Sequence, residues 1–100
     1  MRRGTTPTHQ FVLPFNTELI TAAEITYCQG DQIILQKTEE DCVMQETLVS
    51  ITLSQQDTFK FKENTNVDIQ IRVRDKNGTV FASDIMRVSC QSCLSEEVLA

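Results

Sequence analysis

The sequence predicts an all-β fold: an antiparallel, immunoglobulin-like β-sandwich of about seven short strands, with one short helical turn and extended termini. Hydrophobic and polar residues alternate along several segments, turn-forming residues separate these segments, and no long segment has the 3.6-residue period of an amphipathic helix. The 100 residues are 40% hydrophobic and 23% charged, a composition that excludes a disordered or collagen-like chain and suits one globular domain.

The clearest alternation runs over residues 67–74, where four aliphatic side chains interleave with polar ones, and it recurs over residues 47–53. A period of two places the aliphatic side chains of each segment on one face. We therefore expect seven side chains to form the centre of one core: Val49, Ile51, Leu53, Val67, Ile69, Ile71 and Val73.

Five shorter segments, residues 11–15, 23–28, 32–36, 79–82 and 85–90, supply the other expected strands. Gly30 and Gly78 lie in the sequences Gln-Gly-Asp and Asp-Lys-Asn-Gly, which are typical of turns between strands. Ser54 and Asp57 have the spacing of a capping box, so one helical turn is expected there, followed by Phe59 and Phe61 packed on the core.

The expected domain organisation has three parts. Residues 1–8 are polar and predict a flexible N-terminal arm, residues 9–91 form the β-sandwich, and residues 92–100 form a C-terminal tail. Leu94, Val98 and Leu99 give the tail the spacing of a marginal helix, too short to be stable alone.

The charge balance excludes two classes of partner. Nine Lys and Arg against fourteen Asp and Glu give a net charge of −5, whereas nucleic acids and anionic membranes select a basic surface. No apolar stretch approaches the roughly 20 residues of a membrane span. Because no apolar segment follows the basic start of the chain, we expect no secretory signal, synthesis in the cytoplasm and reduced cysteines.

Cys90 and Cys93 have CxxC spacing, which is typical of half a zinc site or of a redox pair. The remaining zinc ligands would have to come from Cys28, Cys42 and His9, which contain no second CxxC motif. A redox pair ordinarily lies at the start of a helix, but here the motif follows a strand. We expect four free cysteines and no metal, with the zinc and redox readings as the alternatives.

No set of catalytic residues emerges from the sequence. His9 is the single histidine and lies next to the expected arm, a poor place for a positioned base. The acidic residues 39–41 are typical of a surface loop, and the three glycines are too far apart for a phosphate-binding loop. We expect a protein that is not an enzyme and that has no cofactor.

Charge placement suggests where a partner would bind. Arg72 and Arg74 share one strand face, and Arg87 joins them if its strand keeps the same parity. This face is either an ordinary solvated surface or a docking surface for an acidic partner. Candidate contact residues at the termini are Arg2, Arg3, Leu94, Val98 and Leu99.

Several stretches resemble short proteins that phages and prophages of Gram-positive bacteria encode in tail or baseplate gene regions. They are residues 1–8 followed by 11–15, residues 53–59 followed by 67–73, residues 77–78 and 82–85, and the ending at 96–99. The resemblance contains no catalytic motif. It implies a structural or assembly role, with other phage structural proteins or a second copy as partners, in the host cytoplasm and in the virion. A carbohydrate- or protein-binding β-sandwich module is the alternative.

Overall fold

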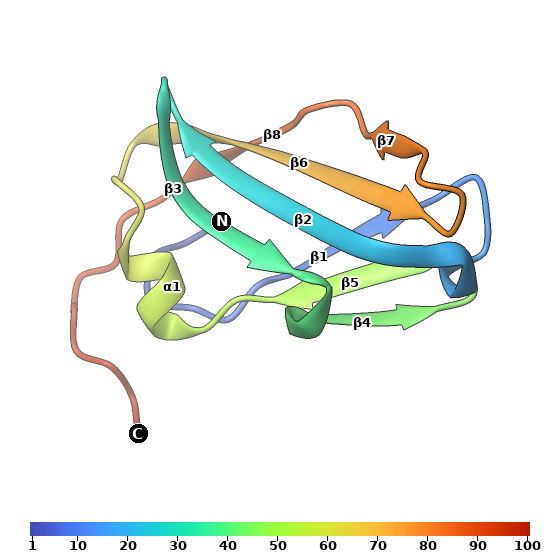
Figure 1. The fold of residues 1–100 in the computed structure, drawn as a ribbon. Coiled ribbons are helices and arrows are strands. Elements are labelled where there is room, and N and C mark those ends of the chain that lie inside the picture. Colours follow the sequence, from blue (N-terminus) through green and yellow to red (C-terminus); the bar gives the residue numbers. More distant parts are fainter.

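The protein folds into two antiparallel β-sheets that lie face to face, in a computed structural model that describes all 100 residues (Figure 1). The larger sheet has the order β3-β2-β6, with β7 and β8 paired to β6, and the smaller sheet has the order β1-β5-β4. The strands are β1 (Thr8–Val12), β2 (Ile20–Gln29), β3 (Gln32–Thr38), β4 (Cys42–Gln45), β5 (Leu48–Thr52), β6 (Thr65–Asp75), β7 (Val80–Ala82) and β8 (Met86–Cys90). The helical turns are η1 (Thr17–Leu19), η2 (Glu39–Asp41) and α1 (Gln55–Phe59). The predicted all-β, two-sheet architecture is confirmed.

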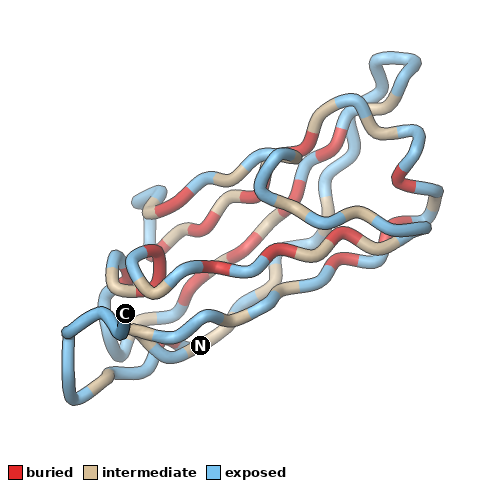
Figure 2. Tube along the Cα trace, turned by 90° about the horizontal axis from the view of Figure 1, so that it is seen from below, coloured by how far each residue is buried: buried red, intermediate tan, exposed pale blue.

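The core lies between the sheets and is built by the predicted alternation. Ile25 pairs with Ile71 across β2 and β6, and both point toward Val49 and its neighbours on the smaller sheet. The seven side chains expected at the centre are all buried, none more than 3% exposed. Figure 2 shows buried and exposed positions alternating along the strands. The parity assigned to the segments 47–53 and 67–74 is therefore correct.

Local sequence determines the turns as predicted. Gly30 connects β2 to β3 with φ of 60°, and Gly78 lies between β6 and β7 with φ of 82°, in the left-handed region that favours glycine. Ser54 and Asp57 form the expected capping box: the Asp57 N–H donates to Ser54 Oγ at 3.0 Å, and the Ser54 N–H donates to Asp57 Oδ2 at 3.1 Å. Phe61 packs in the core, 1% exposed.

The smaller sheet contains a strand that the sequence did not predict. Strand β4 has four residues and pairs with β5, so that Met44 lies opposite Val49. Four residues after an acidic turn are too few for their side-chain pattern to predict a strand. Pairing with β5 is what makes this segment a strand. On the other sheet, β7 and β8 form an edge that is interrupted around Ser83, whose hydroxyl accepts the Ile71 N–H at 3.2 Å.

The N-terminal segment is not the free arm expected from its composition. The Met1 amino group donates to the Ser89 carbonyl at 2.8 Å, and the backbone N–H of Arg3 donates to the Gln91 carbonyl at 3.0 Å. The Leu53 N–H donates to the Pro7 carbonyl at 2.9 Å, so the segment is attached at both ends. Backbone groups at strand ends need partners, and residues 1–7 supply them.

The tail also differs from expectation. Residues 92–100 contain no helix and run as an irregular segment past α1 (Figure 1). Helix nucleation is costly, and nine residues that bury no apolar face cannot offset it. None of the helices in the structure has the length and apolarity needed to cross a membrane.

Candidate functional site

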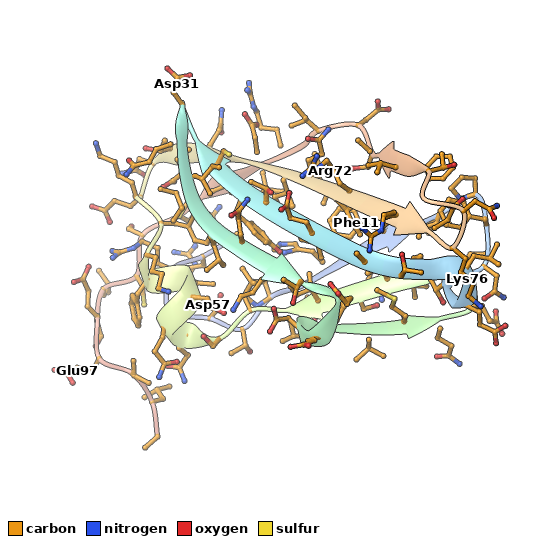
Figure 3. The ribbon with its side chains drawn as sticks, viewed as in Figure 1. Phe11, Asp31, Asp57, Arg72, Lys76 and Glu97 are labelled. Carbon is orange, nitrogen blue, oxygen red and sulfur yellow. The ribbon has the colours of Figure 1, made fainter.

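The three arginines predicted to share a surface lie on the outer face of the larger sheet. Arg87 of β8 is the cross-strand partner of Asp68 on β6, which places it on the same face as Arg72 and Arg74. Figure 3 shows Arg72 on this outer side and Phe11 between the sheets. The expected parity of Arg87 is therefore correct.

Two of these arginines are already paired with carboxylates. Arg87 Nε lies 2.7 Å from Asp68 Oδ1, and Arg72 Nη2 lies 3.0 Å from Glu24 Oε1. The hydrogen bond from Arg87 lowers the pKa of Asp68. Arg74 donates to Thr21 Oγ1 at 3.2 Å and is the one arginine of the three without a carboxylate partner. Cross-strand ion pairs thus occupy a face that the sequence suggested as a basic docking surface.

A shallow depression of about 290 Å³ lies on this face. The residues that line it include Ala22, Ala23, Glu24, Arg72 and Arg74. The Glu24–Arg72 ion pair borders this depression. The depression combines an apolar surface with the charged side chains of Glu24, Arg72 and Arg74.

Arg2 and Arg3 contact the tail of their own chain. Arg3 Nη1 lies 2.6 Å from Glu96 Oε1, while Nη2 donates to the Phe59 carbonyl at 3.1 Å. The Arg3 guanidinium carbon also lies 5.6 Å from the centre of the Phe59 ring, and Gly4 approaches the same ring so closely that a Cβ there would lie 2.7 Å from Cζ. Arg2 Nη1 donates to the Ser92 carbonyl at 2.6 Å.

A third attachment of the tail comes from Gln55 of α1. Its Nε2 donates to the Leu99 carbonyl at 2.9 Å, and its Oε1 accepts the Leu99 N–H at 2.8 Å. One side-chain amide thus pairs with a backbone as a neighbouring strand would. Gln55 is not among the contact residues predicted from the sequence, because a single glutamine in a helical turn carries no recognisable signal.

The three apolar side chains predicted as contact residues stand in solvent. The exposed fraction is 108% for Leu94, 78% for Leu99 and 45% for Val98. The tail is therefore held through its backbone and Glu96 while its apolar side chains remain unburied.

His9 lies on β1 and not on a free arm. Its Nδ1 is 2.8 Å from the hydroxyl of the buried Tyr27. Burial lowers the pKa of His9 and raises the pKa of Tyr27, so that both side chains are neutral at pH 7. This pair joins the two sheets, because Tyr27 belongs to β2.

All four cysteines are free thiols. Cys90 is buried, and Cys28, Cys42 and Cys93 are half-buried. Burial raises the pKa of Cys42 to about 11 and also raises the pKa of Cys90. No group of three or more His, Cys, Asp or Glu side chains is arranged to hold a metal ion.

The fold and these surfaces define an all-β, sandwich-like domain of two sheets whose tail displays apolar side chains on a fixed backbone. No protein-family model, no curated protein and no solved structure matches this chain.

Proposed function

We propose that this chain is a non-enzymatic structural or assembly module that acts through protein–protein contacts. The observation that carries the proposal is the tail. Leu94, Val98 and Leu99 are exposed, yet the tail that carries them is attached through the backbone at Ser92 and Leu99 and through the side chain of Glu96.

Holding a segment in place reduces the conformational entropy that binding must remove. An apolar side chain on a held backbone can therefore enter a partner's groove at a lower entropic cost than one on a free tail. Glu97 projects from the same tail away from the sheets, so the displayed segment is both acidic and apolar (Figure 3).

The resemblance to phage and prophage proteins suggests the setting. It supports a place in a tail or baseplate, with other phage structural proteins as partners, in the host cytoplasm during synthesis and in the virion afterwards. We also propose that the sandwich is immunoglobulin-like, since two antiparallel sheets of short strands within 100 residues suit that architecture.

A carbohydrate- or protein-binding module is the second candidate. The depression beside Arg72 and Arg74 favours it, because the charged side chains among its lining residues can form directional hydrogen bonds. Titration with mono- and disaccharides, followed by chemical shifts of the residues that line the depression, tests this candidate.

Binding to the products of the neighbouring genes tests the main proposal. The triple variant Leu94→Ser, Val98→Ser, Leu99→Ser is compared with wild type in co-purification and calorimetry. Leu19→Ser is the matched control, because Leu19 is also an exposed leucine, 47% exposed, but lies in η1. We expect the triple variant to lose binding and the control to keep it. Equal binding by all three proteins contradicts the proposal.

A further inference from the structure

The outer face of the smaller sheet carries no charged side chain. In the registers of β1 with β5 and of β4 with β5, alternate residues point away from the core. The eight outward residues are Thr8, Gln10, Val12, Val43, Gln45, Leu48, Ser50 and Thr52. Their inward neighbours, such as Phe11 and Val49, are buried.

The outer face of the larger sheet provides an internal comparison. It carries five charged side chains: Glu24, Asp68, Arg72, Arg74 and Arg87. About a quarter of all residues in the chain are charged, at 23%. A solvated sheet face ordinarily shares in that charge, whereas the centre of a protein–protein interface is depleted of it. In charge content, the outer face of the larger sheet therefore resembles a solvated surface, whereas the outer face of the smaller sheet resembles an interface.

The uncharged face also exposes apolar surface. Val12 is 77% exposed and Val43 is 70% exposed, and they belong to the two edge strands of the sheet. Leu48 on the central strand is half-buried and lies across from Val12. Covering these side chains would remove apolar area from water without desolvating an ion.

We propose that this face is the interface between two copies of the chain. A charge-free face has no complement to offer a nucleic acid or a strongly charged protein. Two copies that each carry a charge of −5 approach with least repulsion through a surface without carboxylates. Ser50 lies in the middle strand between Gln10 and Val43, so a twofold axis near Ser50 brings each residue of the face against a neutral residue of the other copy.

The face is smaller than a standard protein–protein interface. Three strands about 4.8 Å apart, two of five residues and one of four, cover less than the roughly 800 Å² that each partner of a standard interface buries. We infer a reversible dimer whose population depends on concentration.

This inference rests on the proposed function only in assuming protein–protein contact, and it adds the surface and the partner. Sedimentation velocity of the full chain between about 10 μM and about 1 mM tests it, in the range where interfaces smaller than standard associate. The variants are Val43→Lys and Val12→Lys on the face, with Gln36→Lys on an exposed position of β3 as the control. Each adds one positive charge, so an effect of net charge alone appears equally in all three.

We expect the wild-type mass to rise toward twice the monomer mass, and Gln36→Lys to behave identically. Both face variants should remain monomeric with unchanged circular dichroism. Because no ions meet at the interface, added salt should leave the association in place. The inference is overturned if wild type stays monomeric throughout, if both face variants associate like wild type, or if salt dissolves the dimer. The triple tail variant separates the two proposals: loss of partner binding with intact self-association supports both.

Discussion

Lys37 of the edge strand β3 forms an ion pair with Asp57 of α1, with 3.1 Å between Nζ and Oδ2. The same Asp57 oxygen accepts the backbone N–H of Ser54 in the capping box. Both side chains are mostly buried, with 22% of Lys37 and 12% of Asp57 exposed. A lysine that points inward from an edge strand discourages the pairing of that edge with another chain, and α1 supplies the carboxylate that makes the lysine tolerable there.

Replacing Asp57 should therefore destabilise the protein, and two variants separate the contribution of the ion pair from that of the cap. Asp57→Asn keeps an acceptor for the Ser54 N–H but removes the charge partner of Lys37. Asp57→Ala removes both, and we expect it to lower the free energy of unfolding by about 1–3 kcal/mol, more than Asp57→Asn does. Urea denaturation measures both values. Gln56→Ala, exposed in the same helical turn, should change stability little. Equal stability of Asp57→Ala and wild type would show that the cap and the ion pair contribute nothing.

Ile71→Ala tests the centre of the core. Ile71 is 1% exposed and lies between the two sheets, so its truncation removes apolar burial and leaves a cavity. We expect a loss of about 2–5 kcal/mol in the free energy of unfolding, measured by denaturant titration. The comparison is Val80→Ala, since Val80 is 57% exposed. A loss for Ile71→Ala no larger than that for Val80→Ala would contradict the packing described above.

The free energy of unfolding should fall as the pH drops below 6.5, the ordinary pKa of a histidine side chain. Burial lowers the pKa of His9 in the folded protein, so the unfolded chain binds a proton more readily. The contribution of His9 is thus complete above pH 6.5 and is lost as the pH falls through the folded pKa. Thermal midpoints recorded between pH 8 and pH 5 measure the effect. His9→Gln keeps a hydrogen-bond partner for Tyr27 and cannot titrate. The stability of this variant should therefore change less between pH 8 and pH 5 than that of wild type. The same pH profile in both proteins would exclude His9 as the cause.

The four cysteines should react as free thiols at different rates. In denaturant without reductant, all four should titrate with a thiol reagent, because none is in a disulfide. In the folded protein Cys42 should react slowly at pH 8, since its pKa of about 11 leaves little thiolate, and the burial of Cys90 should protect it as well. Elemental analysis should find no zinc. One equivalent of zinc, or fewer than four thiols in denaturant, would contradict this prediction.

The elements predicted correctly from the sequence depend on local chemistry. The alternation around Ile51 and Ile71 determines which side chains face inward, because successive residues of a strand point to opposite faces. Gly30 and Gly78 mark turns because they adopt positive φ, and Ser54 with Asp57 caps a helix because three residues separate them in the chain. Each of these signals lies within a few residues and needs no partner from elsewhere in the fold.

Contacts between residues far apart in the chain could not be predicted from the sequence and are seen only in the tertiary structure. The pairing of Arg72 with Glu24, of Arg3 with Glu96 and of Gln55 with the Leu99 backbone joins segments 48, 93 and 44 residues apart. The same holds for the N-terminal segment, whose polar composition indicates a free arm until the end of β8 offers it backbone partners. A local pattern shows which way a strand faces. It cannot show which strand lies beside it, because that choice is made by the free energy of the packed sheets as a whole.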